Sequence, residues 1–301
     1  MSIFRRVAER GSFSAASADL GLARGAASAI VAQLERRLGV QLIERTTRSL
    51  RLTDDGRAYL DRAIHLLDEL HALEDEVGSA ERRPRGRLRV QIPPGLARIV
   101  VAPALPGFFE AYPDVELEIL SRNGVPDFVG ERIDAAIVVG ELPDLDISCR
   151  VIGNIPFMTV AAPTYLARAG IPATPADLGS HQCLPFISSV THETLPWRFR
   201  VPEGEMTVHI EGRACFESNE TAVAAAVKGL GIMQLASYLV YHPIRDGQLT
   251  PVLETFRPSS AKMRIVQPRH RFKPRKLRVF EDFLIELNDT TCRKWGVQQV
   301  D

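Results

Sequence analysis

The stretch from Gly11 to Thr53 constrains the fold of this chain more than any other. Ser12 or Ser14 can cap a short helix, Ala15–Leu20, because a serine oxygen accepts a hydrogen bond from a backbone N–H at a helix start. Gly21 then supplies a turn that a side chain would hinder. The beginning of this stretch therefore predicts a helix that ends in a sharp turn.

A second helix is predicted from Ala23 to about Leu38, where Gly39 ends it. Its predicted core face consists of Ala26, Ile30 and Leu34. Residues 44–53 are rich in arginine and threonine and predict a tight basic hairpin. Two helices joined by a glycine-containing turn and followed by a basic hairpin describe a winged helix-turn-helix. On spacing alone, the alternative is an ordinary helical hairpin with a solvated basic face.

A spaced set of short motifs supports the first interpretation. The set comprises Gly11–Ala16 (GSFSAA), Leu34-Glu35, Leu38–Leu42 (LGVQL), Glu44-Arg45 and Leu52–Gly56 (LTDDG). It resembles the DNA-binding domain of LysR-type transcriptional regulators, and the similarity continues to about Leu287. The order of two helices and a hairpin fits the grooves of DNA. The second helix can enter the major groove, and the hairpin arginines can reach phosphates or the minor groove. The predicted DNA contacts are Arg24, Ala27, Ser28, Gln33, Thr46, Thr47, Arg48 and Arg51.

The chain departs from the family pattern at the start of the second helix. The family usually has Ser-Gln-Pro where this chain has Ala23-Arg24-Gly25. Loss of the serine cap costs about 1 kcal/mol, and loss of proline removes a preorganised first turn. The arginine that usually follows the recognition serine is Ala29 here, while Ser28 is kept. DNA binding is therefore expected, but the family's base preference is not carried over. Met1 also lies close to Phe13, which leaves two alternatives: a short first helix, or a true start other than Met1.

Charge and cysteine content narrow the functional class. The chain is neutral overall, but its first 60 residues hold ten of the 37 basic residues and only six of the 37 acidic ones. This basic end fits DNA binding. The four cysteines form no Cys-x-x-Cys motif, which argues against zinc or a disulfide framework. Buried reduced thiols are expected, although the resemblance also raises a peroxide-sensing pair, Cys183 with Cys215.

Several classes of protein are disfavoured by missing signals. The sequence contains no nucleophile-elbow, zinc-protease or phosphate-loop motif, so neither an enzyme nor a cofactor or metal is expected. It has no apolar run of membrane-spanning length and no signal-peptide core in Met1–Glu9. We therefore expect a cytoplasmic protein without a membrane partner.

Residues from Asp54 to about Glu76 predict a long helix with an apolar seam. The seam consists of Leu60, Ala63, Leu67, Leu70 and Val77. Such spacing is typical of a coiled coil and predicts a dimerisation helix, as the resemblance also implies. The alternative is a helix packed on its own domain. A polar hinge is expected over 78–86.

The remaining chain alternates strand and helix patterns. Leu88–Ile92, Val115–Ile119 and Ala135–Val139 predict strands, with helices to about Tyr112 and over Pro126–Arg132. This order predicts βαβ units and a mainly parallel sheet. The pattern repeats with a strand at 157–160, helices Pro163–Ala169, Asn219–Lys228 and Ser237–Arg245, a strand Gly231–Leu235, and a hairpin near 197–210. The chain is then expected to return to the first group of strands through residues 265–267, and its last predicted helix is Pro274–Asn288.

The predicted fold is α/β with three parts. They are a winged helix-turn-helix domain (1–56), a linker and dimerisation helix with its hinge (57–86), and an effector-binding domain (87–301). The resemblance implies that the last part has the two-lobed architecture of type 2 periplasmic binding proteins. The expected lobes are about 87–158 with 266–301, and about 159–265.

Ligands of such folds bind at strand ends and helix starts, where free N–H groups favour anions. The predicted effector contacts are Pro94, Gly95, Leu96, Arg122, Gly140, Ser218 and Asn219. Many family members have Ser or Thr where Gly95 falls, and the absence of this hydroxyl argues against a carboxylate ligand. A ligand bulkier at that end is also expected. The alternative is that these residues form ordinary turns and caps.

The sequence thus predicts a regulator that binds a promoter inverted repeat in double-stranded DNA as a homodimer or homotetramer. The expected effector is a small, anionic or strongly polar molecule, and the family resemblance allows RNA polymerase as a further partner. Two alternatives stay open: a DNA-binding regulator without a ligand, and a solute receptor or enzyme on the same two-lobed fold.

Overall fold

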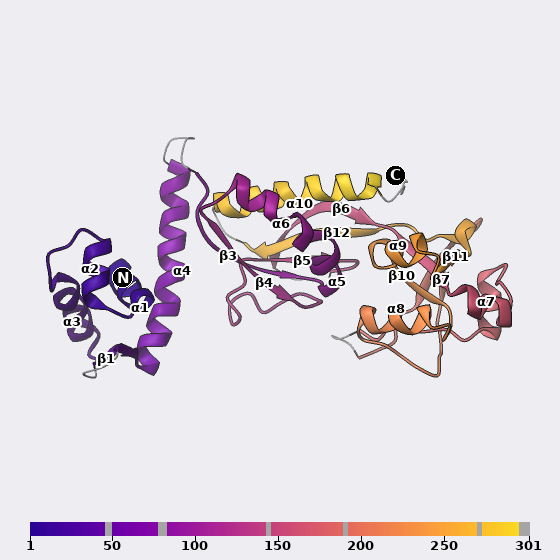
Figure 1. Cartoon of the computed structure of the whole chain (residues 1–301), viewed down its shortest axis with the longest axis horizontal. Helices are drawn as coiled ribbons and strands as arrows, with labels where there is room; N and C mark the ends of the chain where they lie inside the picture. The colour runs from indigo at the N-terminus through magenta and orange to yellow at the C-terminus, as the bar shows by residue number, and fades with distance from the viewer. Residues whose placement is uncertain (46–49, 78–82, 143–145, 189–191, 270–272, 295–301) are drawn as a thin grey trace. The chain divides into compact units, whose positions relative to one another are not determined.

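The computed structural model describes residues 1–45, 50–77, 83–142, 146–188, 192–269 and 273–294 (Figure 1). The chain divides into two compact units, of which the first covers residues 1–82 with 272–274 and the second covers residues 83–271 with 275–301. Each unit has its own hydrophobic core.

The first unit contains the helix-turn-helix. Its elements are α1 (Ser2–Arg10), α2 (Phe13–Asp19), α3 (Ala26–Leu38), β1 (Ile43–Arg45), β2 (Leu50–Leu52) and α4 (Asp54–Val77). Its buried core comprises Phe4, Val7, Ala16, Ala27, Val31, Leu34, Leu42 and Ile43. The Phe4 ring meets the Tyr59 ring edge-on with centroids 5.5 Å apart, so α4 packs on α1. The antiparallel pair β1–β2 confirms the predicted hairpin, whose tip lies outside the described residues.

Two details of the predicted helices are corrected. Ser12, and not Ser14, caps α2, since its Oγ accepts a hydrogen bond from the Ala15 amide at 3.4 Å. Helix α3 begins at Ala26 instead of Ala23, because Gly25 has a left-handed φ of 88° that no helix continues. Its core face is Ala27, Val31 and Leu34, while Ile30 is 38% exposed.

Glu35 ties α3 to the hairpin. Its Oε1 accepts hydrogen bonds from the amides of Leu42, at 2.8 Å, and Ile43, at 3.0 Å. Thr53, on the other side of the hairpin, donates from Oγ1 to the Gln41 carbonyl at 2.7 Å. The Glu35 bonds hold the start of the hairpin to α3, and the Thr53 bond holds its end to Gln41.

The second unit begins with a sheet of five strands in the order β4-β3-β5-β12-β6. They are β3 (Gly86–Ile92), β4 (Val115–Ser121), β5 (Ala135–Val139), β6 (Ile147–Ile155) and β12 (Ala261–Pro268). Its helices are α5 (Pro94–Leu96), the π-helix η1 (Ala97–Val101), α6 (Ala102–Ala111) and α10 (Arg275–Lys294). Phe108 of α6 contacts the rings of Phe280 and Phe283 of α10, which joins the two helices. We call this sheet with its helices lobe I.

Lobe II is built on a three-stranded sheet in the order β10-β7-β11. Its strands are β7 (Phe157–Ala161), β10 (Met233–Ala236) and β11 (Thr250–Val252), and a separate hairpin is formed by β8 (Trp197–Val201) and β9 (Gly204–Val208). Its helices are α7 (Pro163–Ala169), η2 (Pro175–Ser180), α8 (Asn219–Val227), α9 (Ser237–Arg245) and η3 (Glu254–Phe256). The predicted bounds of α7 and α9 are confirmed.

The expectation of a mainly parallel sheet is only partly correct. Strand β3 is parallel to β4 and β5, but β12 is antiparallel to β5 and β6, and β7 is antiparallel to both its neighbours. The reason is that β12 returns from lobe II and enters the sheet in the opposite direction.

The predicted helix Pro126–Arg132 is wrong. These residues form turns, in which Asp127 Oδ1 accepts hydrogen bonds from the amides of Val129 and Gly130 at 3.2 and 2.9 Å. Arg132 then has a φ of 56°, which stops any continuation as a helix.

We expect Glu35→Ala to lower the free energy of unfolding of the first unit by about 1–3 kcal/mol, because two amides lose a charged acceptor. Urea denaturation followed by circular dichroism measures the change. Glu44→Ala, at an exposed position on β1, is the control. Equal stability of Glu35→Ala and the parent would show that water replaces the carboxylate without cost.

Candidate DNA-binding surface and effector cleft

The outward face of α3 is the candidate reading surface. Its exposed residues are Ala29, Ile30, Gln33, Arg36 and Arg37, and Ser28 is half-buried at the edge. Arg24 is exposed in the turn before the helix. The predicted contact at Ala27 is wrong, since this residue is 0% exposed and packs in the core of the unit.

The charges around α3 favour an anionic partner. Among the described residues, Arg24, Arg36, Arg37 and Arg51 have no carboxylate partner. Other arginines of the unit are neutralised: Arg10 pairs with Asp19 at 2.5 Å, and Arg57 pairs with Asp54. The exposed arginines are therefore available for phosphate groups. The predicted contacts Thr46, Thr47 and Arg48 lie outside the described residues, and Arg51 is exposed on β2.

Ile30 is a candidate contact that the sequence reasoning missed. It was assigned to the core face, but it lies beside Ala29 and Gln33 on the exposed face. Apolar side chains in the major groove distinguish thymine through its methyl group. The signal that could have found it is the alternative core row Ala27, Val31 and Leu34, which turns Ile30 outward.

The seam of α4 is divided between two environments. Ala63 and Leu67 are 1% and 7% exposed within the single chain, and Leu60 packs partly on the core of the first unit. Leu66 and Leu70 remain 51% and 49% exposed. The predicted dimer seam is thus corrected at Leu60, Ala63 and Leu67, which are covered by the chain itself. Val77 belongs to the part of α4 whose side chains are not described.

Gly95 does not leave the open space that the sequence suggested. A Cβ added there would lie 2.4 Å from Cδ2 of Leu239 and 3.3 Å from Cε2 of Tyr238. Gly95 and Leu96 are buried, and Pro94, the first residue of α5, is partly exposed. The glycine therefore permits close packing of α5 on α9, and the expectation of a bulkier ligand at this end is wrong.

The other predicted effector residues lie at strand and helix ends. Gly140 has a φ of 100°, its amide donates to the Lys262 carbonyl at 3.0 Å, and its carbonyl accepts from Arg264. Ser218 caps α8 through the Thr221 amide at 3.4 Å, and Asn219 is the first residue of that helix. Arg122 pairs with Glu131 at 2.5 Å within lobe I.

Two ion pairs connect the lobes. Arg98 of η1 lies with Nε 2.7 Å from Oε1 of Glu220 on α8. Arg198 of β8 donates from Nη2 to Oε1 of Glu141, which follows β5, at 2.5 Å. The first pair links the neighbourhoods of Gly95 and Asn219, and the second links the neighbourhood of Gly140 to β8. Sequence reasoning missed all four charged residues, because their partners are far apart in the chain.

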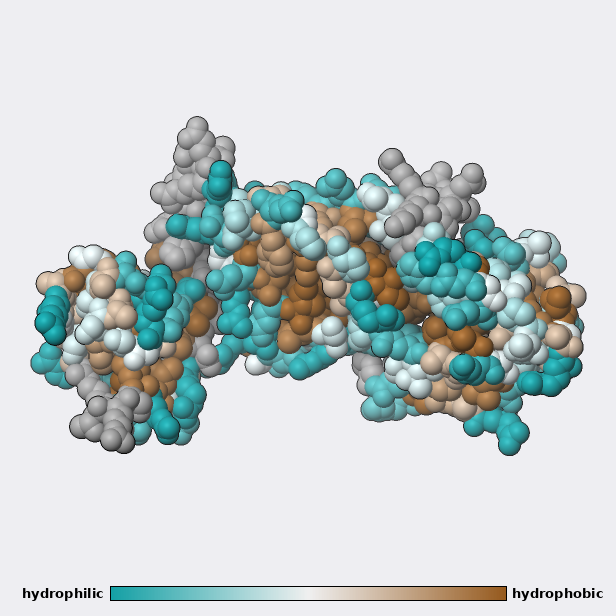
Figure 2. Space-filling view, viewed as in Figure 1, coloured by the Kyte–Doolittle hydropathy of each residue, from teal (hydrophilic) through white to brown (hydrophobic). Residues whose placement is uncertain are grey.

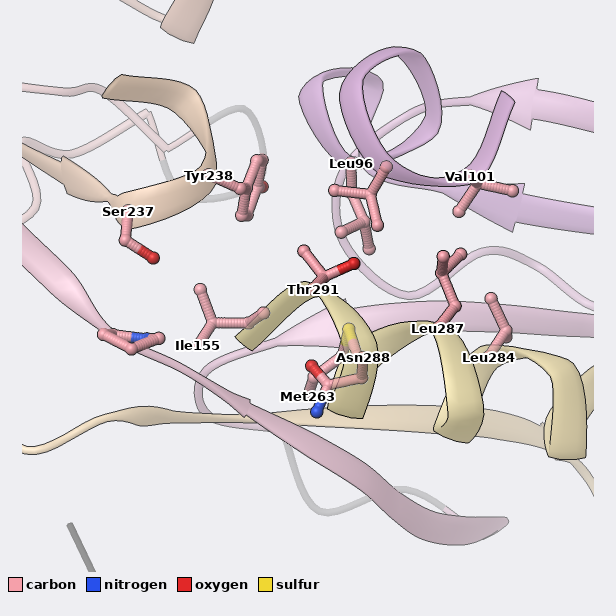
Figure 3. A pocket seen from close by; sticks show the side chains of 12 residues that line it. Leu96, Val101, Ile155, Ser237, Tyr238, Met263, Leu284, Leu287, Asn288 and Thr291 are labelled. Carbon is pink, nitrogen blue, oxygen red and sulfur yellow. The ribbon is translucent and has the colours of Figure 1, made fainter. Parts of the chain in front are cut away.

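A small cavity lies where the chain crosses between the lobes (Figure 3). Its volume is about 20 Å³, and its walls include Leu96, Ile155, Ser237, Met263 and Leu287. Ser237 donates from its amide to the Pro156 carbonyl at 2.8 Å, while its Oγ is buried without a partner among the described atoms. A cavity of this size accommodates one water molecule. It is a packing feature of the crossing and too small for an effector.

The cysteines divide into two environments. Cys183 is 1% exposed, and burial raises the pKa of its thiol to about 11. Because the thiolate is the reactive species, Cys183 is a poor partner for peroxide. Cys149 and Cys215 are exposed, so the expectation of buried thiols holds for Cys183 and is wrong for those two. The side chain of Cys292 lies outside the described residues.

Other kinds of site were sought across the described part of the chain. No cluster of His, Cys, Asp or Glu residues there could hold a metal ion. None of the described helices is long and apolar enough to span a membrane.

A winged helix-turn-helix followed by a two-lobed α/β unit defines a class of bacterial transcriptional regulators. Residues 1–57 match the model of the bacterial regulatory helix-turn-helix protein, lysR family, and residues 81–289 match the LysR substrate binding domain. The chain belongs to the LysR family of transcriptional regulators, which are not enzymes.

Full-length relatives agree with this assignment. The chain is 34% identical over 294 residues to the HTH-type transcriptional regulator CrgA of Neisseria meningitidis serogroup C (strain 8013), with 97% of each chain covered. It is 32% identical to the regulator YhjC of Escherichia coli (strain K12), covering 94% of this chain and 95% of that one. The solved structure of CrgA from Neisseria meningitidis has a TM-score of 0.61 at 33% identity, covering 95% and 96%. The structure of AphB, a Vibrio cholerae virulence activator, has a TM-score of 0.58 at 26% identity, covering 95% and 97%.

We expect the cross-lobe pair Glu141–Arg198 to weaken in acid. The hydrogen bond from Arg198, followed by its charge, holds the pKa of Glu141 below the ordinary value of 4.5. The pair is therefore fully present above about pH 4.5 and is lost as the pH falls through the lowered pKa. Carbon-detected NMR titration should show that Arg198→Gln raises the pKa of Glu141.

The control for this titration lies on the same strand. Arg200 donates to Ser259 Oγ at 3.0 Å, so Arg200→Gln should leave the pKa of Glu141 unchanged. If Arg198→Gln also leaves that pKa unchanged, the two side chains are not paired in solution.

Proposed function

We propose that this LysR-family regulator binds an interrupted inverted repeat in a promoter and that a small-molecule effector between lobe I and lobe II alters the placement of its DNA-binding units. The observation that carries the first part is the exposed face of α3, flanked by arginines without carboxylate partners among the described residues. The protein acts in the cytoplasm, where its DNA is, and RNA polymerase is a further candidate partner.

The contacts on DNA fall into two groups. Arg24, Arg36, Arg37 and Arg51 bind phosphates and set affinity, with Thr46, Thr47 and Arg48 of the hairpin proposed beside them. Ser28, Ile30 and Gln33 face the bases and set sequence preference. Ala27 is not among the contacts, because it is buried.

The active form is proposed to be a homodimer or homotetramer, since two half-sites need two reading helices. Exposed Leu66 and Leu70 on α4 offer one apolar surface for a second copy. Hydrophobic residues also gather over the sheet of lobe I near its edge strand β4 (Figure 2), and Phe109 of α6 is 37% exposed. Burial of these surfaces in an oligomer removes apolar area from water.

The proposed effector site is the cleft bounded by Pro94, Gly95 and Leu96 on one side, Gly140 on the second and Ser218 with Asn219 on the third. Close packing of Gly95 on Leu239 and the two cross-lobe ion pairs favour a second candidate, a regulator whose cleft is filled by its own side chains. The two candidates differ in whether any small molecule changes operator affinity.

The DNA assignment predicts two kinds of variant. Arg51→Ala and Arg36→Ala should weaken binding to all sequences alike, and each should reduce the salt dependence by about one phosphate contact. Ile30→Ala should instead change preference at one base pair, by about 1–3 kcal/mol if it reads a base. Gel-shift titrations at several salt concentrations measure both effects.

The control is Arg245→Ala, because this exposed arginine of lobe II pairs with Asp246. If Arg36, Arg51 and Ile30 can all be replaced without effect on DNA binding, the reading surface lies elsewhere.

For the oligomer, Leu66→Glu with Leu70→Glu should reduce the molar mass in light scattering and abolish specific operator binding, because charges would line the proposed apolar surface. Circular dichroism should show an intact fold, since both leucines are exposed in the single chain. Leu67→Glu is the contrasting variant and should unfold the unit, as Leu67 is 7% exposed. An unchanged molar mass of a folded double variant would assign the dimer to other surfaces.

A further inference from the structure

The cross-lobe ion pairs have a reciprocal arrangement. Lobe I contributes Arg98 and Glu141, while lobe II contributes Glu220 and Arg198. Each lobe therefore provides one cation and one anion to the other. We call these four residues the clasp.

The two carboxylates of the clasp stand next to predicted effector contacts. Glu141 directly follows Gly140 at the end of β5, and Glu220 directly follows Asn219 at the start of α8. These are the strand end and helix start at which such folds receive anions. The chain thus places its own carboxylates where those of a ligand are expected.

The clasp combines exposed side chains with an anchored backbone at Arg198. Gln234 accepts from the Arg198 amide at 3.2 Å and donates to the Arg198 carbonyl at 2.9 Å, which fixes β8 at this position. The side chains themselves are solvent-accessible, with 51% of Arg198, 81% of Glu141, 62% of Arg98 and 48% of Glu220 exposed. Exposed ion pairs are weak, so another carboxylate can replace a partner without a large cost.

A different pair in the same unit shows the contrast. Arg150 lies 3.1 Å from Glu281, whose side chain is only 1% exposed. Removing Arg150 would leave a buried carboxylate, so this pair is structural. Arg122, the arginine expected from the sequence to receive an anion, is paired with Glu131 inside lobe I and does not reach across the cleft.

We propose that Arg98 and Arg198 recognise two anionic groups of the effector and that Glu220 and Glu141 occupy these arginines until the effector displaces them. The inference rests on the proposed effector site and names the class of its ligand, a small dicarboxylate or a molecule with two similarly separated anionic groups. Binding then exchanges lobe-to-lobe bonds for lobe-to-ligand bonds, which couples ligand binding to the arrangement of the lobes.

The test is calorimetric titration of the full-length protein with succinate, glutarate and adipate, which differ in the separation of their carboxylates. Adipamide, which is neutral, should not bind. Arg98→Gln and Arg198→Gln should each weaken binding about tenfold or more, because a charged hydrogen-bond donor is lost. Glu220→Gln and Glu141→Gln should each tighten it about two- to fivefold, because an internal competitor with the strength of an exposed ion pair is removed.

The arginine variants should weaken binding and the glutamate variants should tighten it. This difference in sign distinguishes a role in ligand recognition from a purely structural role. A structural role would make the glutamate variants bind equally or more weakly, and either result overturns the proposal. Failure of all three dicarboxylates to bind the Glu141→Gln/Glu220→Gln double variant overturns it as well. Arg87→Gln is the matched control, because Arg87 pairs with Glu118 on neighbouring strands inside lobe I and should not affect binding.

Operator titrations distinguish this inference from the proposed function. If a dicarboxylate alters operator affinity equally in the parent and in all four single variants, the proposed function stands but the clasp does not recognise the effector. If a dicarboxylate binds tightly through the clasp but never alters operator affinity, the clasp recognises the ligand but the proposed effector control of DNA binding is wrong.

Discussion

Lobe I depends on the pairing of one strand from far along the chain. Strand β12 lies between β5 and β6 and pairs antiparallel with both, and Ile265 and Val266 are buried in its middle. Without it, β6 has no neighbour in the sheet and α10 has no continuous surface to cover. The same return creates the second crossing between the lobes.

Local patterns predicted the local elements well. Proline at the first turn and Gly170 at the end define α7, whose bounds were predicted, as were those of α9, which instead carries Pro243 in its interior. The failures have identifiable causes. Helix α3 is rich in alanine, so two apolar rows compete and only packing against α1 and α2 decides that Val31 and not Ile30 faces inward. At residues 126–132, Asp127 accepts amides as a helix N-cap would, but the positive φ of 56° at Arg132 ends the segment as turns.

The candidate sites likewise contain some residues that local sequence predicts and others that only tertiary packing places. Exposed Arg24 and Arg51 were predicted as contacts from composition and position, whereas exposed Arg36 and Arg37 were not. The burial of Ala27 and the contact between Gly95 and Leu239 depend on which helices pack together, which one sequence does not specify. The pairs Arg98–Glu220 and Arg198–Glu141 join residues 122 and 57 positions apart, so no local motif could reveal them. The resemblance indicated the segments of the expected effector site but not these ion pairs.

The position of β12 also determines the order in which the protein can fold during synthesis. The first unit is complete once α4 has left the ribosome, and the strands of lobe II all precede β12. Strands β3, β4 and β5 are made early but must wait for residues 261–268 before their sheet can close. At about 5–20 residues per second, this delay is on the order of ten seconds. During that time the edge of β5 lacks its native partner, which makes the nascent lobe I the part of this regulator most in need of a chaperone.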